Sequence, residues 1–269
     1  MNMQKINRIS DTFNKLKIAG RKGFIAYVTG GDPDIDTTHE LVLAIEQAGA
    51  DIIEIGVPFS DPMADGPVIQ LASERALAAG TSLRKIIALV EDLRKQTQVP
   101  LVLMSYYNPI LRYGLAQFAA NAAAAGVDGV IIPDLPFEEA ATLQVVLDKK
   151  DIFLIPLVAP TSTAERLEHG LRSVQGFVYC VAVNGTTGGI SANSNDVARY
   201  CAQVAMHTKI PLAIGFGISN KEQAAKMSEY ADAVIVGSAI VKIIEQYHND
   251  KALMLNKVAE FVREIHAAI

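Results

Sequence analysis

The pattern that decides the fold is clearest in residues 51–67, which read DIIEIGVPFSDPMADGP. A short apolar run, Asp51–Ile55, leads into a loop rich in Gly, Pro and Asp, and a helical stretch follows. The residues before this run also predict a helix, because apolar side chains recur at helical spacing at Leu41, Ala44, Ile45 and Ala48. Asp36 is a candidate cap for the start of that helix, and Gly49 marks its end.

The same order of apolar run, loop and helix recurs along the whole chain of 269 residues. The expected strands are Phe24–Thr29, Asp51–Ile55, Leu101–Ser105, Gly129–Ile132, Ile152–Leu157, Gly176–Val181, Leu212–Ile214 and Ala233–Val236. Runs of Ile, Val and Leu with little alternation suit parallel strands that are buried on both faces. Eight such units predict an α/β fold of the (β/α)₈ TIM-barrel type, although a doubly wound open sheet gives the same local signals.

A single TIM-barrel domain spanning 1–269 is the simplest interpretation of the chain. No Gly/Ser-rich or Pro-rich linker, low-complexity tract or charge block divides it. Ahead of the first expected strand, apolar residues at helical spacing are Ile6, Ile9, Phe13 and Leu16. We expect them to form an extra N-terminal helix that covers one end of the barrel.

Composition excludes several classes of protein. Half of the residues are hydrophobic and 20% are charged, which excludes intrinsic disorder. The net charge is −5 and the basic residues are scattered, so the electrostatic footprint of a nucleic-acid binder is absent. The two cysteines, Cys180 and Cys201, form no CxxC motif and predict neither a disulfide framework nor a zinc site. With no signal-peptide core in residues 1–17 and no run suited to span a bilayer, we expect a cytoplasmic protein.

Two carboxylates near the second expected strand are candidates for acid–base chemistry, because barrel active sites lie at the C-terminal ends of the strands. Glu54 lies between Ile53 and Ile55 in a short buried strand. Burial disfavours the ionised carboxylate, so we expect a raised pKa and a group that acts as an acid near neutral pH. Asp65 lies in a Gly/Pro-rich loop, where water or backbone amides can keep it ionised. The alternative is that Glu54 is a satisfied core acid and Asp65 a turn residue.

Three glycine-rich turns follow the last three expected strands, at residues 184–189, 215–219 and 237–240. Glycine lets backbone N–H groups approach an anion, and the loops after strands seven and eight are the usual phosphate position in barrels. Ser219 with Glu222 forms a candidate capping box, and Ser238 is a candidate cap of a short helix. One such turn alone is ordinary turn chemistry, but three in this order predict a phosphate site. No turn has a dinucleotide or P-loop signature.

The tyrosines, histidines and lysines are further candidate functional side chains. Tyr106 and Tyr107 follow the third expected strand and Tyr179 lies in the sixth, where their rings are suited to stack on a flat ligand, with plain packing as the alternative. No pair of histidines has metal-ligand spacing, so we expect no metal site. No lysine lies within or at the end of an expected strand, which disfavours a Schiff-base aldolase.

Residues 54–70, EIGVPFSDPMADGPVIQ, resemble the signature segment of the tryptophan synthase α-subunit family. Further segments resemble the family in the same order: VTGGDP at 28–33, YNP at 107–109, IIPDLP at 131–136, GFGIS at 215–219 and GSAIVK at 237–242. The resemblance covers the chain from about Phe13 to the C-terminus. It implies a lyase of tryptophan biosynthesis, which cleaves indole-3-glycerol phosphate by a retro-aldol reaction into indole and glyceraldehyde 3-phosphate.

The resemblance also implies a role for individual residues. Glu54 corresponds to the catalytic glutamate that protonates indole C3 and manages the proton on the glycerol hydroxyl next to the ring. Asp65 corresponds to the aspartate that holds the indole N–H, and Tyr179 to a tyrosine beside the catalytic glutamate. The implied substrate-binding residues are Tyr27, Tyr106, Thr187, Gly188, Gly217, Gly237 and Ser238.

Family members pair with a β subunit, in an α–β–β–α complex, that receives the indole and uses pyridoxal phosphate to join it to serine. The resemblance therefore implies no cofactor in this chain, and it places the contact with the partner at Pro58, Asp61 and Pro62. The segment from Val183 to about Asn195 corresponds to a mobile lid over the substrate. Val183 stands where many members have an arginine, so we expect lid closure to be made differently here.

Three other functions compete with this one. A sugar-phosphate isomerase or epimerase would share the late glycine turns but would not need Asp65 in an Ala-Asp-Gly loop. A catalytically silent protein that only activates a β subunit would not need Glu54 and Asp65 together. A flavin-binding barrel oxidoreductase would be yellow when purified.

Overall fold

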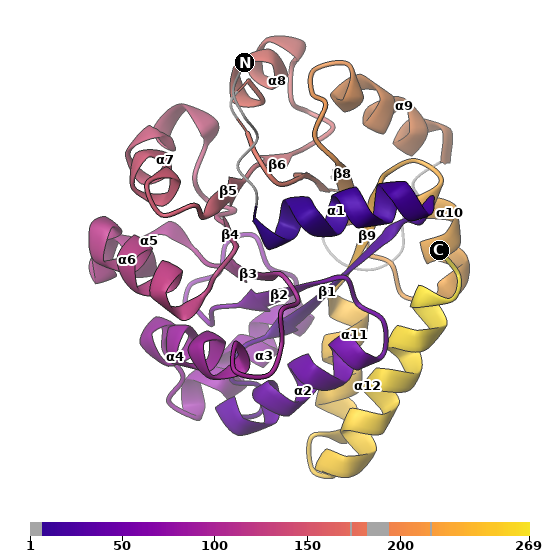
Figure 1. Cartoon of the computed structure of the whole chain (residues 1–269). Helices are drawn as coiled ribbons and strands as arrows, with labels where there is room; N and C mark the ends of the chain where they lie inside the picture. The colour runs from indigo at the N-terminus through magenta and orange to yellow at the C-terminus, as the bar shows by residue number, and fades with distance from the viewer. Residues whose placement is uncertain (1–6, 173, 182–193, 216) are drawn as a thin grey trace.

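The computed structural model describes residues 7–172, 174–181, 194–215 and 217–269. Within these residues nine strands form one sheet in the order β5-β4-β3-β2-β1-β9-β8-β7-β6, and every neighbouring pair is parallel. The strands are β1 (Gly23–Thr29), β2 (Ile52–Gly56), β3 (Leu101–Met104), β4 (Gly129–Ile131), β5 (Phe153–Ile155), β6 (Leu157–Val158), β7 (Val178–Val181), β8 (Leu212–Gly215) and β9 (Ala233–Val236). Helices surround this sheet on the outside, which confirms the predicted (β/α)₈ TIM barrel (Figure 1).

All eight expected strands are present, and one of them is divided. The expected strand at 152–157 forms β5 and β6 with Pro156 between them. Proline lacks the N–H group that a ladder of hydrogen bonds needs, so it interrupts a strand. Because β5 pairs with β4 and β6 pairs with β7, this one segment joins both ends of the sheet and closes the barrel.

Twelve α-helices lie in the described residues, among them the predicted N-terminal helix (α1) and the helix predicted between Asp36 and Gly49 (α2). They are α1 (Arg8–Ala19), α2 (Ile35–Gln47), α3 (Pro67–Ala78), α4 (Leu83–Leu93), α5 (Tyr107–Tyr113), α6 (Leu115–Ala125), α7 (Ala141–Asp148), α8 (Ala164–Gly170), α9 (Ser194–Ala205), α10 (Lys221–Ser228), α11 (Ser238–Tyr247) and α12 (Lys251–His266), with a short 3₁₀ helix η1 (Phe137–Glu139). The predicted cap of α2 is wrong by two residues. Asp34 is the cap, because its carboxylate accepts the Thr37 N–H at 2.7 Å, and Asp36 lies in the first turn.

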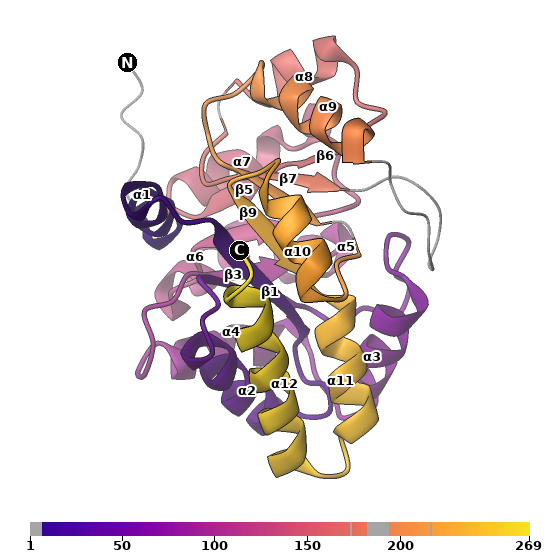
Figure 2. The ribbon, with the colours of Figure 1, turned by 90° about the vertical axis from the view of Figure 1, so that its right-hand side faces the viewer.

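Helix α1 lies across one end of the barrel, as predicted for the N-terminal segment (Figures 1 and 2). Its residues Ile9, Phe13 and Leu16 belong to a buried cluster inside the barrel. We call this the inner cluster, and its other members are Ile25, Ile52, Val102, Ile131, Phe153, Ile155, Phe177, Ala213, Ala233 and Ile235. Ile6 lies outside the described residues. The end of the barrel at which the strands begin is therefore closed by apolar packing.

Alternation along each strand decides which side chains face the interior. Ile52 belongs to the inner cluster, whereas Ile53 and Ile55 pack outward against the helices. Since successive side chains point to opposite faces, Glu54 shares the inward face with Ile52 but lies nearer the strand's C-terminal end. The same alternation turns Tyr27 inward on β1 and Tyr179 inward on β7, beyond Ile25 and Phe177. The layer above the inner cluster is therefore polar.

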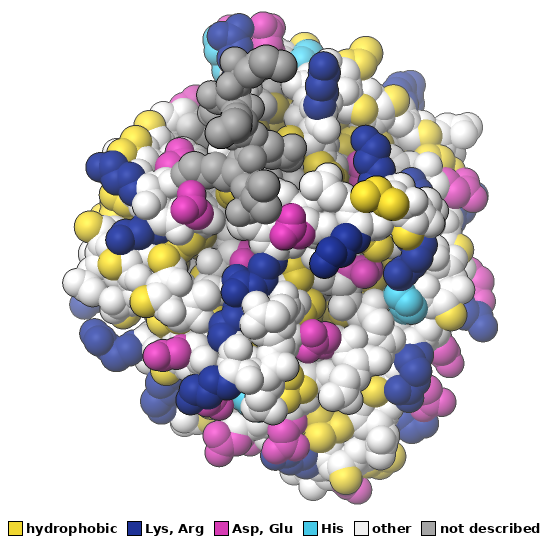
Figure 3. Space-filling view, in the orientation of Figure 1, with side chains coloured by type: hydrophobic (Ala, Val, Ile, Leu, Met, Phe, Trp, Pro, Cys, Tyr) yellow, Lys and Arg dark blue, Asp and Glu magenta, His cyan; other side chains and the backbone are white. Residues whose placement is uncertain are grey.

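The face that carries α1 shows intermingled basic and acidic side chains (Figure 3). No helix of the described residues is long and apolar enough to cross a membrane.

Candidate active site

Glu54 lies inside the barrel with an exposed fraction of 1%. Neither of its carboxylate oxygens has a hydrogen-bond partner among the described residues. Burial, and secondly the charge of Asp65, raise the pKa of Glu54 to about 8. This agrees with the pKa shift expected from the sequence. At neutral pH the carboxyl group therefore holds a proton that it can donate.

Two tyrosines lie in the same layer as Glu54. Tyr27 on β1 is in register with Glu54 on β2, and Tyr179 comes from β7. Burial raises the pKa of both phenols, so both hydroxyls stay protonated. The Tyr27 hydroxyl lies 3.3 Å from the Thr29 hydroxyl.

Two glycines make room for these tyrosine rings. A Cβ atom at Gly56 would lie 2.2 Å from the Tyr27 hydroxyl, and one at Gly215 would lie 2.7 Å from the Tyr179 hydroxyl. Any larger residue would force the rings to move. Sequence reasoning missed Gly56 and assigned Gly215 only to a phosphate turn. The signal that identifies them is register across strands, which the sequence does not contain.

Asp65 lies in the loop before α3 and is half-buried. Burial raises its pKa, and a hydrogen bond from the Tyr106 hydroxyl opposes that rise. The same hydroxyl accepts the Ala64 N–H at 2.8 Å, and burial raises the pKa of Tyr106 to about 12. The Tyr106 side chain therefore favours the ionised form of Asp65, and the expectation that water or backbone amides also keep it ionised stays a prediction. Phe59 packs on the Tyr106 ring with centroids 5.3 Å apart.

Three of the predicted phosphate residues, Gly217, Gly237 and Ser238, lie at the turns after β8 and β9. Gly237 precedes α11 and provides no side-chain cap, so the first N–H groups of this helix have no side-chain acceptor there. Ser238 is the first helical residue rather than the cap. Gly217 has φ of +61°, a conformation that favours glycine, and a Cβ there would meet none of the described residues within 4 Å. Thr187, Gly188 and the predicted lid residues 183–193 lie outside the described residues.

The predicted capping box at Ser219 is wrong. Asn220 caps α10, because its side chain accepts the Gln223 N–H at 2.9 Å. Gln223 in turn accepts the Ser219 N–H at 2.8 Å. The turn after β8 is therefore fixed to the start of α10 by side chains on both sides.

The predicted partner loop is exposed over part of its length. Pro58 is buried, Pro62 is half-buried, and Asp61 is exposed and accepts a hydrogen bond of 2.5 Å from the Ser60 hydroxyl. The neighbouring Met63 is 87% exposed.

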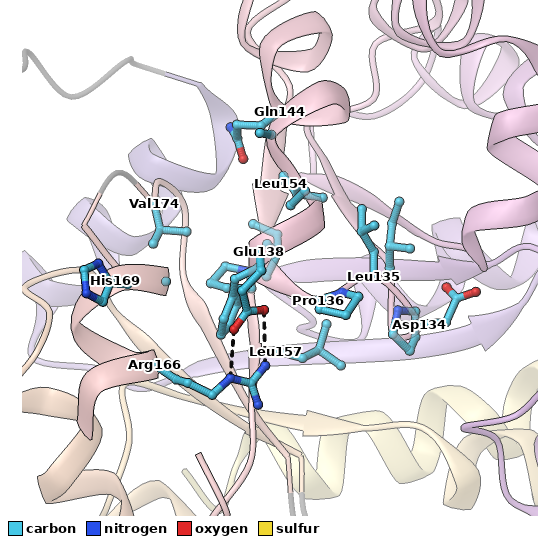
Figure 4. Close-up of a pocket in the computed structure, with 18 of the residues that line it drawn as sticks. Asp134, Leu135, Pro136, Glu138, Gln144, Leu154, Leu157, Arg166, His169 and Val174 are labelled. Atoms are coloured by element: carbon cyan, nitrogen blue, oxygen red, sulfur yellow. Dashed lines mark hydrogen bonds and ion pairs between the residues drawn. The ribbon is translucent and has the colours of Figure 1, made fainter. Parts of the chain in front are cut away.

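A separate cavity lies among the described residues. It has a volume of about 670 Å³ and lies between β4, the β5–β6 segment, α7 and α8 (Figure 4). Apolar residues such as Leu135, Leu154 and Val174 line most of it, and an ion pair between Arg166 and Glu138 at 3.0 Å crosses it. It contains none of the predicted site residues. No group of three or more His, Cys, Asp or Glu residues in the described part of the chain is arranged to hold a metal ion.

The fold and this arrangement define the class of protein: a (β/α)₈-barrel enzyme whose buried acid faces the C-terminal ends of the strands. Comparison with known proteins then identifies the family. The family model for the tryptophan synthase alpha chain matches residues 13–269.

Individual relatives agree with the family model. The chain is 47% identical over 264 residues to the tryptophan synthase alpha chain of Caldanaerobacter subterraneus subsp. tengcongensis, covering 98% of this chain and 100% of that protein. It is 49% identical over 264 residues to that of Citrifermentans bemidjiense, covering 98% of each. Among solved structures, tryptophan synthase subunit alpha from Legionella pneumophila is similar with a TM-score of 0.93 and 38% identity, covering 98% of this chain and 99% of that one. The chain belongs to the tryptophan synthase alpha chain family.

Proposed function

We propose that Glu54 and Asp65 carry the lyase reaction of this family, the cleavage of indole-3-glycerol phosphate to indole and glyceraldehyde 3-phosphate. The observation that carries the proposal is the buried Glu54 carboxyl, which has no partner among the described residues and has a pKa raised to about 8. A carboxyl kept protonated near neutral pH by burial is suited to general acid catalysis.

Glu54 acts first as an acid and then as a base. Its proton goes to indole C3, which makes this carbon tetrahedral and leaves positive charge on the ring nitrogen. The resulting Glu54 carboxylate takes the proton of the glycerol hydroxyl next to the ring as the carbon–carbon bond breaks. The bonding electron pair returns to the ring, the hydroxyl carbon becomes the aldehyde, and Glu54 is protonated again.

Asp65 holds the indole N–H and stabilises the positive charge on the ring nitrogen. Its hydrogen bond from the Tyr106 hydroxyl supports this role, because the bond favours the ionised form against the effect of burial. Tyr27 and Tyr179 form the walls beside Glu54. The two carboxyl groups thus take opposite roles, one as proton donor and one as fixed negative charge.

The phosphate binds at the turns after the last strands. Gly217, Gly237 and Ser238 supply N–H groups there, together with Thr187 and Gly188. The uncapped N-terminus of α11 supports this placement, since free N–H groups at a helix start attract anions.

A β subunit is the proposed partner, in an α–β–β–α complex that holds pyridoxal phosphate in the β chains and passes indole between the active sites. The exposed Asp61 and Met63 and the half-buried Pro62 support a docking surface at this loop, with Pro58 anchoring it from within. The two cysteines, Cys180 and Cys201, are free thiols, which supports a reducing cytoplasmic location.

The test is indole release from indole-3-glycerol phosphate by the purified chain, alone and with a β subunit from the same source. We expect slow release that rises sharply when β is added. A chain that releases no indole in either condition, while β's own activity is still enhanced, would be a binding-only regulator. A yellow preparation with a flavin absorbance spectrum would instead support a barrel oxidoreductase.

A further inference from the structure

Arg75 on α3 connects three segments of the barrel rim. Its Nε and Nη2 atoms donate to the two carboxylate oxygens of Asp32, each at 2.8 Å. Its Nη1 atom donates to Glu245 Oε1 at 3.3 Å. Asp32 lies in the turn after β1, and Glu245 lies on α11. One guanidinium group therefore joins α3, the turn after β1 and α11.

The connection to Asp32 is shielded from water. The Asp32 side chain is 1% exposed and the Arg75 side chain 25% exposed. A bidentate pair of guanidinium and carboxylate fixes the orientation of both groups as well as their distance. The connection to Glu245 is looser, because that side chain is 39% exposed. The pair with Asp32 is the rigid part of the contact, and the pair with Glu245 extends it to the neighbouring helix.

The connected segments lead to different ends of the proposed substrate site. Helix α3 begins at Pro67, two residues after Asp65. Helix α11 begins at Ser238, in the proposed phosphate turn, and packs beside α3 (Figure 2). The indole end and the phosphate end of the site thus lie at the starts of two helices, which Arg75 connects near their C-terminal ends.

We propose that Arg75 is a positioning residue that sets the distance between the indole end and the phosphate end of the substrate site. The inference rests on the proposed function, because it takes its two ends from that substrate. Indole-3-glycerol phosphate joins ring and phosphate covalently, so both ends bind together only if the protein holds them at the matching distance. A misplacement of about 1 Å far from the chemistry can lower a rate by about 100-fold.

The experiment compares binding of a linked ligand with binding of its two halves. The linked ligand is a non-cleavable analogue in which a propyl chain joins indole to phosphate, and the halves are indole and glycerol 3-phosphate. Their dissociation constants are measured by calorimetry on the full chain for wild type, Arg75→Met, Arg75→Lys and Glu245→Ala. Arg172→Met is the matched control, because Arg172 makes an exposed ion pair with Glu168.

For Arg75→Met we expect affinity for the linked analogue to fall by about 10- to 100-fold, while each half binds within about threefold of wild type. Glu245→Ala removes only the ion pair between Arg75 and Glu245. It should lower affinity by about threefold to tenfold for the linked analogue alone. Arg75→Lys should recover part of the loss, and Arg172→Met should behave like wild type.

Two results would overturn the inference. Equal losses for the linked analogue and both halves would make Arg75 a structural residue only, and unchanged affinity for the linked analogue would remove it from the site. If Arg75→Met fails to fold, Glu245→Ala decides, because its side chain is exposed and its replacement leaves the pair with Asp32 in place. Analogue binding does not depend on turnover, so a chain that binds it but releases no indole would refute the proposed function and still test Arg75.

Discussion

Asp128 and Glu54 are both buried carboxylates, but they lie at opposite ends of the barrel in unlike surroundings. Asp128 precedes β4 at the end that α1 covers, and it is 3% exposed. It pairs with Arg94 at 2.6 Å and Arg8 at 2.9 Å, and it accepts the Leu101 N–H at 2.9 Å. Glu54 is 1% exposed near the other end and has no such partner among the described residues.

The difference separates what stabilises the barrel from what equips it for chemistry. A buried charge is costly unless it is paired and hydrogen-bonded, and the environment of Asp128 meets both conditions. The environment of Glu54 meets neither, so the group keeps its proton to a pKa of about 8. A barrel built only for stability would replace such a carboxyl with an apolar side chain. Unpartnered burial at Glu54 is therefore evidence of function.

The largest effect is expected for Glu54→Gln, which removes the acid and keeps the shape. Indole release should fall by about 10²–10⁴-fold, the usual contribution of a positioned acid–base group. The free energy of unfolding should not decrease, because Glu54 is ionised in the unfolded chain at neutral pH and must take up a proton on folding, whereas an amide is neutral in both states. Turnover assays and urea unfolding measure the two quantities, and near-normal turnover would remove Glu54 from the mechanism.

Arg94→Met should have the converse effect at the other end of the barrel. It leaves Asp128 buried with one guanidinium fewer, and the backbone oxygens of Gly126 and Val99 lose a donor. Breaking a buried ion pair from one side costs about 3–5 kcal/mol. We expect urea unfolding to show a loss of that order, while kcat/KM of the folded enzyme stays within about threefold of wild type. A large loss of kcat/KM without loss of stability would contradict this separation of the two ends.

The substitutions Gly217→Val and Gly20→Val compare the effect of backbone strain at the two ends of the barrel. Both glycines have positive φ, +61° and +66°, and in the described part of the chain a Cβ at either position would meet nothing within 4 Å. Each substitution should therefore cost a similar 1–2 kcal/mol or so of backbone strain. Gly217→Val alone should raise KM for the phosphorylated substrate, by about tenfold, since it crowds the N–H groups of the phosphate turn.

Inhibition by unphosphorylated indole analogues is the control for these two variants and should not change. If Gly217→Val weakened those analogues as much as the substrate, the phosphate site would lie elsewhere. If Gly20→Val raised KM equally, general strain rather than position would be the cause.

The smallest effect is expected in the pH dependence. Since Glu54 must be protonated to act as an acid, kcat/KM should fall as pH rises through about 8, by up to about tenfold per pH unit. The folded protein binds this proton more tightly than the unfolded chain, whose glutamate has the ordinary pKa of 4.5. The contribution of Glu54 to stability is therefore fully present below pH 4.5 and is lost as pH rises through about 8. Glu54→Gln should lack this component, and identical stability profiles for both proteins would refute the shift.

The sequence predicted most of the fold and several features of the site. All eight strands, the N-terminal helix and the raised pKa of Glu54 followed from local apolar runs, helical spacing and the cost of burying a charge. The errors in the prediction concerned the exact positions of helix caps. Helix caps were placed on Asp36 and Ser219 instead of Asp34 and Asn220, because neighbouring polar residues have similar capping preferences and only geometry chooses between them.

The sequence by itself therefore determined the parallel strands and the residue types at their ends, since these depend on short-range patterns, whereas closure of the sheet into a barrel depends on the pairing of β5 with β4 and of β6 with β7. Tertiary structure alone decided the contacts between distant residues. Arg75 meets Asp32 across 43 positions and Glu245 across 170, and Gly56 leaves room for Tyr27 only because β1 and β2 pair in one register. Long-range pairing depends on how the closed sheet brings strand ends together, and no local pattern records it.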